Sequence, residues 1–177
     1  MQDRLHGIAR VLGALSNAAL WIASIGMIAM TAMVALQVFS RYVLNSSPSW
    51  TEAASIMVMS WFIFLGAAVG VRENFHMGFD VLVHFLPDAA APWMRAISDL
   101  AILVFAAGMV LYGLQLTIDT WTATIPVLGL PGGFSYMPIV GGGALMFLFA
   151  LERLVLRASG IKVDHDPNAE DILLSDA

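Results

Sequence analysis

The sequence predicts an all-α integral membrane protein with four transmembrane helices, and three observations support this fold class. Of the 177 residues, 59% are hydrophobic and only 12% are charged, whereas a soluble domain carries about 25% charged residues. The mean hydropathy is +0.82. The apolar residues are gathered into four long runs, and each run approaches the roughly 20 residues that a helix needs to cross the hydrocarbon core.

The first apolar run covers about residues 18–39 and contains no charged residue. Because Arg4 and Arg10 precede it, a cleaved signal peptide is the alternative interpretation. The apolar core of a signal peptide has only about 7–15 residues and is followed by a cleavage site of small residues. This run is longer and no such site follows it closely, so we expect a retained transmembrane helix.

The remaining runs cover about residues 51–71, 96–117 and 136–156. They are continuously apolar, whereas a transmembrane β-barrel would show alternation over segments of about 10 residues. The fourth run begins with the glycines 141–143 and carries Glu152 and Arg153 near its end. Because glycine allows close approach of helices in membranes, we interpret the glycine run as a packing surface.

Basic residues predict the orientation of the chain in the membrane. With a cytoplasmic N-terminus, only Arg41 of the basic residues lies outside, and the positive-inside rule then places both termini in the cytoplasm. Residues 1–177 are expected to form a single membrane domain, in which residues 157–177 are an acidic cytoplasmic tail. The basic residues expected inside are Arg4, Arg10, Arg72, Arg95, Arg153, Arg157 and Lys162.

The connection between the second and third spans is predicted to contain a short interfacial helix on the cytoplasmic side. His76, Asp80 and His84 are spaced four apart, so on a helix they share one face, and Pro87 would end that helix. These three side chains could ligate a metal ion. Because a metal site generally needs a fourth ligand, we favour a polar helix face and expect no metal site.

The outer connections are predicted to differ in character. The first is short, so Arg41 at the end of the first span and Glu52 at the start of the second would lie close together. They could pair with each other, contact a partner, or reach independently for lipid headgroups. The second, residues 119–135, contains turn residues together with an apolar set, and it has no basic residue. We expect this apolar connection to be structured and covered by a partner or by the membrane surface.

The sequence lacks the patterns that indicate catalysis or solute passage. Ionisable side chains in a span usually mark such a path, but Arg41, Glu52, Asp99 and Asp119 lie near span ends. The chain contains no cysteine, which excludes thiolate metal sites and cysteine nucleophiles. It has no basic stripe for nucleic acid. We therefore expect no enzyme activity, no catalytic residue, no cofactor and no nucleic-acid partner, and we do not expect this chain to carry a solute by itself.

Several short motifs follow one another in a definite order along the chain. They are Arg41-Tyr42-Val43-Leu44-Asn45, Trp50-Thr51-Glu52, the run 61–68, Arg72, His76-Met77, Asp80, Leu128-Gly129-Leu130-Pro131, Tyr136 and the run 138–141. In order and spacing they resemble the small membrane (Q-type) subunit of tripartite ATP-independent periplasmic (TRAP) transporters. The sequence departs from that family at Ala53, where a second acid is common, and at Gly132-Gly133, where bulkier residues are common.

The resemblance implies a non-catalytic scaffold subunit in the bacterial inner membrane. In such a system a periplasmic solute-binding protein delivers an organic acid to a large multi-helix subunit, which transports it together with sodium. The small subunit packs against the large one and helps to dock the binding protein. The expected partners are therefore the large subunit, the binding protein and membrane lipids. The substrate itself does not follow from this sequence.

The resemblance also implies a set of interface residues. Those expected on the outer side, facing the binding protein, are Arg41, Trp50 and Glu52. Those expected to pack against the large subunit are Trp61 and Gly66, for which packing within this chain is the alternative. Those expected to fix the cytoplasmic helix are Arg72, His76 and Asp80. The alternative functions are a free-standing four-helix channel or exporter and a membrane anchor subunit of an electron-transfer enzyme.

Overall fold

The computed structural model describes residues 2–46, 48–73 and 91–158. These residues form four long helices and a short 3-10 helix, with no strand among them. Each long helix contains a segment long and apolar enough to cross a membrane, so the prediction of a four-helix transmembrane fold is confirmed. The predicted interfacial helix lies outside the described residues. The helices are α1 (Gln2–Tyr42), α2 (Trp50–Arg72), α4 (Ala91–Asp119), η1 (Gly132–Ser135) and α5 (Met137–Ala158).

Helix α1 is much longer than the span predicted for it. It has 41 residues, which corresponds to about 60 Å at the α-helical rise. Its polar first turns join the apolar run without a proline or a pair of glycines between them, so nothing ends the helix there. The apolar segment Arg10–Tyr42 alone has 33 residues, more than a hydrocarbon core of about 30 Å requires, so this helix must tilt or extend beyond the core.

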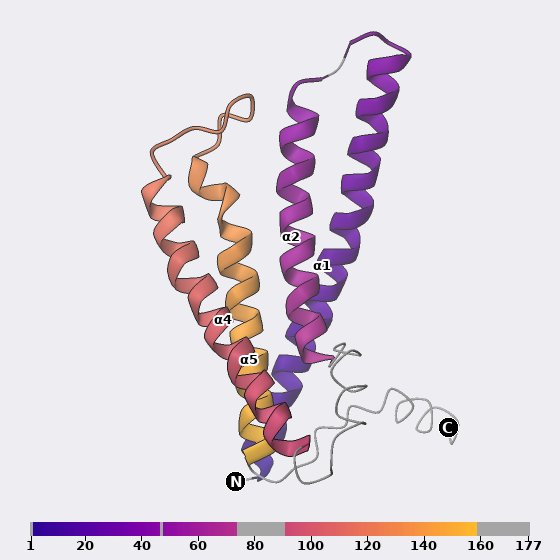
Figure 1. Cartoon of the computed structure of the whole chain (residues 1–177). Helices are drawn as coiled ribbons and strands as arrows, with labels where there is room; N and C mark the ends of the chain where they lie inside the picture. The colour runs from indigo at the N-terminus through magenta and orange to yellow at the C-terminus, as the bar shows by residue number, and fades with distance from the viewer. Residues whose placement is uncertain (1, 47, 74–90, 159–177) are drawn as a thin grey trace, which may run out of the picture.

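The four helices pack in a row rather than as a closed bundle. Helix α1 packs on α2, α2 on α5, and α5 on α4. Figure 1 shows that the α1–α2 and α4–α5 hairpins meet where α2 and α5 end and diverge toward their loops. As a result, only 11% of the apolar window of α1 is buried, against 39% for α5.

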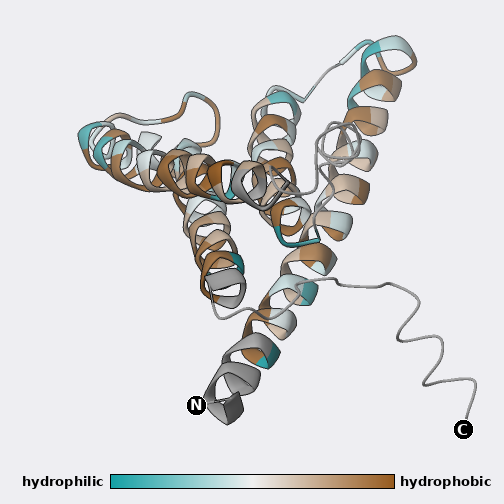
Figure 2. Cartoon of the chain, turned by 60° about the horizontal axis from the view of Figure 1, so that its bottom comes forward, coloured by the Kyte–Doolittle hydropathy of each residue, from teal (hydrophilic) through white to brown (hydrophobic). Residues whose placement is uncertain are grey.

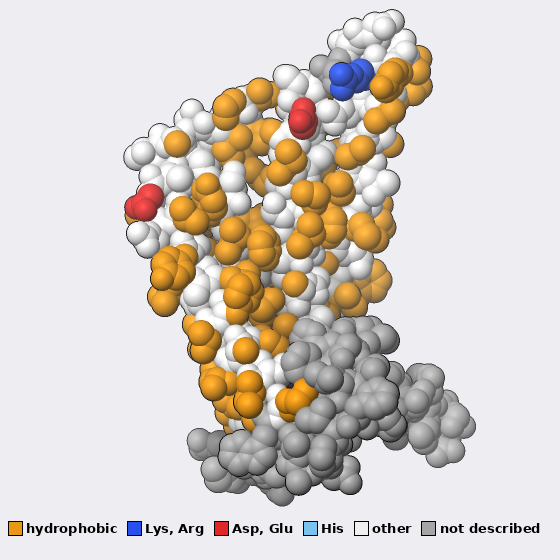
Figure 3. All heavy atoms as spheres, viewed as in Figure 1, with side chains coloured by type: hydrophobic (Ala, Val, Ile, Leu, Met, Phe, Trp, Pro, Cys, Tyr) orange, Lys and Arg blue, Asp and Glu red, His pale blue; other side chains and the backbone are white. Residues whose placement is uncertain are grey.

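The exposed surface of this row is apolar. Figure 2 shows hydrophobic residues recurring along the length of the helices in both hairpins. In Figure 3 apolar side chains are spread over the whole visible described face, and the charged ones seen there lie toward the loop end. Such a surface requires lipid or protein rather than water around it.

The core is concentrated where the hairpins meet. Its fully buried members come from α2, α4 and α5, and Leu12 of α1 packs against them. The predicted glycine packing surface is confirmed here. A Cβ atom on Gly142 would lie 2.5 Å from the Cβ atom of Phe64 on α2, and one on Gly143 would lie 2.9 Å from that of Met109 on α4. The core-forming buried residues are Ala68, Val71, Ala106, Met146 and Phe149.

Candidate functional site

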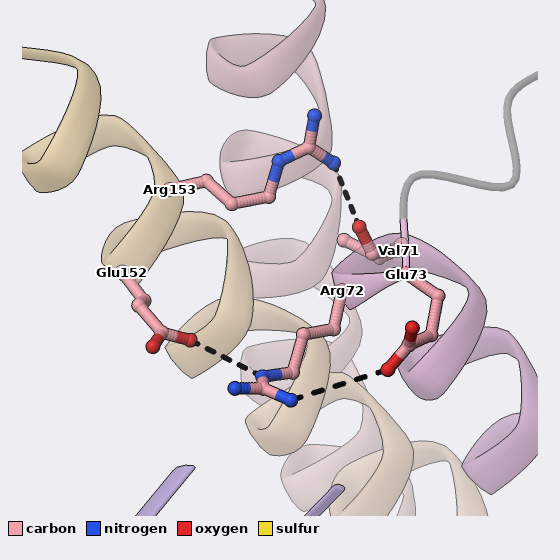
Figure 4. Close-up of polar contacts among 5 residues, drawn as sticks. All are labelled: Val71, Arg72, Glu73, Glu152 and Arg153. Atoms are coloured by element: carbon pink, nitrogen blue, oxygen red, sulfur yellow. Dashed lines mark hydrogen bonds and ion pairs between the residues drawn. The ribbon is translucent and has the colours of Figure 1, made fainter. Parts of the chain in front are cut away.

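A cluster of charged side chains joins three helices where the two hairpins meet. Arg153 of α5 places its Nη2 atom 3.2 Å from Oδ1 of Asp99 on α4. Its Nη1 atom donates a hydrogen bond of 2.7 Å to the carbonyl oxygen of Val71 on α2 (Figure 4). The side chains of Arg153 and Asp99 are only 7% and 2% exposed. One guanidinium group thus connects both hairpins in a buried position.

The contact with Val71 follows from how helices end. The last carbonyl groups of a helix have no partner within it, and α2 ends at Arg72, one residue after Val71. The C-terminal end of a helix also carries partial negative charge, which favours a cation. Arg153 therefore satisfies an acceptor of α2 while its charge is balanced by Asp99.

Arg72 is the second cation of this cluster. Its Nε atom lies 3.4 Å from Oε2 of Glu152 on α5, and its Nη1 atom lies 4.0 Å from Oε1 of Glu73 (Figure 4). The guanidinium carbon lies 5.7 Å from the centre of the Phe149 ring, within range of a cation–π contact. Gly13 brings α1 close, since a Cβ atom there would lie 3.4 Å from Arg72 Nη2. Arg72 thus contacts α5 and lies close to α1, whereas the cytoplasmic helix that it was predicted to fix lies outside the described residues.

These charges act on one another rather than forming a site for a substrate. Each guanidinium group faces at least one carboxylate of the cluster, so the arrangement fastens helices together. Sequence reasoning assigned Asp99, Glu152 and Arg153 to span ends but did not pair them. The pairing could have been predicted, because opposite charges occur at the same end of neighbouring spans, and ionisable groups in spans usually pair with one another.

At the opposite end of the bundle, the predicted outer-side residues are exposed. Arg41 and Glu52 have exposed side chains, and Trp50 begins α2 with an exposed ring. The ion pairs found in the described residues do not join Arg41 to Glu52. Of the three predicted alternatives, contact with a partner and contact with lipid headgroups remain for both Arg41 and Glu52. Thr51 is buried instead, and its hydroxyl group donates a 2.8 Å hydrogen bond to the carbonyl oxygen of Pro48.

The two candidates in the middle of α2 differ in their surroundings. The Trp61 ring lies against α5, because a Cβ atom on Gly141 would be 3.2 Å from its Cζ3 atom. Trp61 therefore packs partly within this chain. A Cβ atom on Gly66 would meet nothing within 4 Å, and the same holds for Gly70 one turn later. Of the two, Gly66 is the position with free space beside it.

The remaining candidates, His76 and Asp80, lie outside the described residues, as does the possible metal ligand His84. Where side chains are described, no group of three or more His, Asp or Glu residues could hold a metal ion. The described residues thus form a cluster of ion pairs that joins the helices at one end of the row, and they leave charged and aromatic side chains exposed at the other end.

Comparisons with known proteins agree with this architecture. Residues 30–160 match the family model described as tripartite ATP-independent periplasmic transporters, DctQ component. The chain is 33% identical over 151 residues to a protein named as a TRAP transporter small permease of Haemophilus influenzae, covering 82% of this chain and 91% of that protein.

Two proteins of Vibrio cholerae are also similar to this chain. One is named as the C4-dicarboxylate TRAP transporter small permease protein DctQ, with 28% identity over 100 residues, 56% of this chain and 40% of that protein. The other is named as the sialic acid TRAP transporter small permease protein SiaQ, with 21% identity over 128 residues, 72% of this chain and 74% of that protein.

Proposed function

The chain belongs to the DctQ component family of tripartite ATP-independent periplasmic transporters, and on that basis we propose that it is the scaffold subunit of a sodium-coupled importer of organic acids. It is a small permease component of a transporter and not an enzyme. Its role in this proposal is to hold the large transport subunit in the membrane and to help dock the solute-binding protein. It carries no substrate itself.

The observation that carries the proposal is the open row of helices. The row leaves apolar side chains exposed on all four helices, and the charged residues of the described spans lie toward their ends, where the cluster of Arg72 and Arg153 is paired. A carrier would instead place ionisable or broken-helix elements near the middle of the membrane. A broad apolar surface without such elements suits a scaffold.

Helix α2 offers a place for the large subunit to pack. Gly66 and Gly70 are four residues apart, and neither position is filled by this chain. Small residues at this spacing let two membrane helices approach closely. The exposed neighbours Ile63 and Ala67 would add apolar contacts to a partner helix. We assign this strip of α2, rather than Trp61, to the large subunit.

The orientation in this proposal follows from the positive-inside rule, with both termini and residues 157–177 in the cytoplasm of a bacterial inner-membrane protein. The exposed Arg41, Trp50 and Glu52 then face the periplasm and are available to the binding protein. The charged cluster lies on the cytoplasmic side. There Arg72 precedes the segment that holds His76 and Asp80, which we propose as an interfacial helix.

The substrate class is proposed from the relatives. Those named for a transported compound are named for C4-dicarboxylates and for sialic acid, and both compounds carry carboxylate groups. We propose a carboxylate as the transported group here, with sodium as the coupling ion.

Purification of the tagged chain from its native membrane in mild detergent, followed by mass spectrometry, tests the scaffold role. We expect a multi-helix membrane protein in stoichiometric amount. A chain that purifies alone, under conditions that preserve other complexes, and that conducts solute in liposomes would support a channel or exporter instead. A bound haem or quinone would support an electron-transfer anchor.

The variant Gly66→Leu tests the assigned strip of α2. Its side chain would occupy the free space beside α2, so we expect loss of the co-purified large subunit while the chain still inserts and elutes as a single species. Gly108→Leu on α4 is the matched control, because a Cβ atom there also meets nothing within 4 Å. Equal recovery of the large subunit with both variants would contradict the assignment.

A further inference from the structure

The loop between α4 and η1, residues 120–131, is apolar to an unusual degree. From residue 120 to residue 151 the sequence contains no Asp, Glu, Lys, Arg or His. A loop that projects into water normally carries polar side chains, because apolar side chains exposed to water are unfavourable. We call residues 120–131 the α4–α5 loop and residues 125–130 its tip.

The backbone of this loop satisfies much of its own hydrogen bonding. Ile125 N–H donates to the Leu130 carbonyl oxygen over 2.7 Å, and Gly132 N–H donates to that of Ala123 over 2.6 Å. Gly129 N–H donates back to Ile125 over 3.0 Å, while Pro126 and Pro131 have no N–H group to satisfy. Internal bonds of this kind lower the cost of moving a backbone segment out of water.

The base of the loop is tightly packed against the end of α4. A Cβ atom on Gly133 would lie 2.5 Å from the carbonyl oxygen of Thr117, and one on Gly132 would lie 2.7 Å from that of Thr120. The ring of Trp121 stacks on that of Phe134, with centroids 5.8 Å apart. A side chain at either position would meet the backbone of α4 or of the loop, which explains the two glycines, and these contacts fasten the base of the loop to the end of α4.

The tip directs an apolar side chain away from the protein. Val127 is 61% exposed and has φ of 74°, a left-handed conformation that is unfavourable for a β-branched residue. A turn in water would normally place glycine or asparagine in that conformation. Strained residues of this kind tend to mark positions where the side chain is used.

The depth of the loop is set by the helix that follows it. The apolar segment of α5, Met137–Val155, has 19 residues, or about 28 Å at the helical rise, close to the roughly 30 Å thickness of the hydrocarbon core. The loop before it therefore lies at the edge of that core. Figure 1 shows the loop projecting past the ends of α4 and α5 and reaching the level of the first turns of α2.

The apolar tip also continues the lipid-facing surface of α4. Val104, Leu111 and Ile118 recur every seven residues along this helix, and all three are highly exposed. Trp121 follows three residues after Ile118, beyond Asp119 and Thr120, and is exposed as well. An amphipathic ring at the end of a membrane helix suits the headgroup layer.

We propose that the tip of the α4–α5 loop inserts into the interfacial layer of the lipid bilayer, with Val127 and Leu130 of the tip and Trp121 at its base all in contact with lipid. Lipid is the occupant that the chemistry favours. A surface for a soluble protein that binds and leaves repeatedly would be expected to carry charged groups for steering and a polar rim, and this loop has no charge.

The test uses single-cysteine variants, which are unambiguous because the chain contains no cysteine. The variants Val127→Cys and Leu130→Cys are labelled with bimane in the full chain and reconstituted in liposomes whose lipids carry a nitroxide near the headgroup. We expect several-fold stronger quenching than for Ser46→Cys, an exposed residue of the α1–α2 loop. The unlabelled cysteines at 127 and 130 should also react several-fold more slowly with a charged maleimide.

Quenching and reactivity at both tip positions equal to those at Ser46 would overturn the proposal. So would protection that appears only when the large subunit or the solute-binding protein is added, because the tip would then contact protein. The experiment does not depend on the scaffold role, since lipid contact is measured with this chain alone. Using two tip positions keeps the test valid if one variant fails to fold.

Discussion

Asp99 and Arg153 form a buried ion pair between α4 and α5, and the same arginine holds the last turn of α2. The contact lies where the two hairpins meet, whereas their loops diverge (Figure 1). The pair therefore fixes one end of the row of helices and leaves the spacing of the other end to lipid or to a partner.

Removing one member of this pair should destabilise the fold strongly. In Asp99→Leu the guanidinium group of Arg153 stays buried without its carboxylate, and we expect the free energy of unfolding to fall by about 3–5 kcal/mol. The double variant Asp99→Leu/Arg153→Met should recover part of the loss. Recovery should be incomplete because Arg153 also binds the Val71 carbonyl oxygen. Thermal unfolding in detergent measures the stability of the wild type, of Asp99→Leu and of the double variant.

Asp119→Asn is the control for this comparison. Asp119 lies on the same helix but is exposed at its C-terminal end, where an acid is not favoured by the helix dipole. We expect it to melt close to the wild type. If Asp99→Leu also melted at the temperature of the wild type, the Asp99–Arg153 pair would have no role in holding the hairpins together.

The Arg72–Glu152 contact should contribute less, but measurably. The two side chains are 16% and 8% exposed and 3.4 Å apart, so a double-mutant cycle with Arg72→Met and Glu152→Gln should give a coupling free energy of about 0.5–3 kcal/mol. Glu73→Gln serves as the comparison, since Glu73 is 4.0 Å from Arg72 and more exposed. Its coupling should stay below about 1 kcal/mol. Equal couplings would show that burial does not distinguish the two acids.

Close packing at Gly142 should be sensitive to a single methyl group. Gly142→Ala places a Cβ atom 2.5 Å from that of Phe64 and 2.9 Å from the Phe64 carbonyl oxygen, so α5 must shift away from α2. We expect a loss of about 1–3 kcal/mol in the free energy of unfolding. The control Gly108→Ala should leave stability unchanged or raise it by up to about 1 kcal/mol, because alanine favours a helix where space is free. A change of the same sign in the free energy of unfolding for Gly142→Ala and for Gly108→Ala would contradict this packing.

The four spans could be predicted because a bilayer requires long uninterrupted apolar helices. The predicted range 51–71 lies within α2, whereas the start of α1 was missed. The turns before residue 18 are too polar to count toward a span, yet nothing in them stops a helix. Apolarity reports where a helix crosses the membrane, not where it ends.

Side-chain partners were harder to predict than spans. That Asp99 meets Arg153, while Arg41 and Glu52 do not meet each other, depends on how each helix is rotated and how far it slides past its neighbour. Those quantities are set by packing contacts such as Gly142 against Phe64. The glycine run could be recognised as a packing surface, but which helices it contacts became visible only in three dimensions.

Exposed Glu52 is expected to matter for uptake rather than for folding. It lies in the first turn of α2, where the helix dipole favours an acid, and it forms no ion pair within the described residues. If it contacts the binding protein, Glu52→Ala should lower uptake several-fold when the binding protein is limiting. A contact at the rim of an interface mainly affects association, so excess binding protein should restore much of the rate.

The measurement is substrate uptake in proteoliposomes that contain the complete membrane complex, at two concentrations of binding protein. Asp119→Ala is the matched control, since it removes another exposed acid outside the charged cluster without changing α2. Insertion and complex assembly should be normal for both variants. Unchanged uptake by Glu52→Ala at normal expression would remove Glu52 from the docking surface and leave it as a boundary charge that reaches for lipid headgroups. A loss that excess binding protein does not reverse would instead place its effect inside the membrane complex.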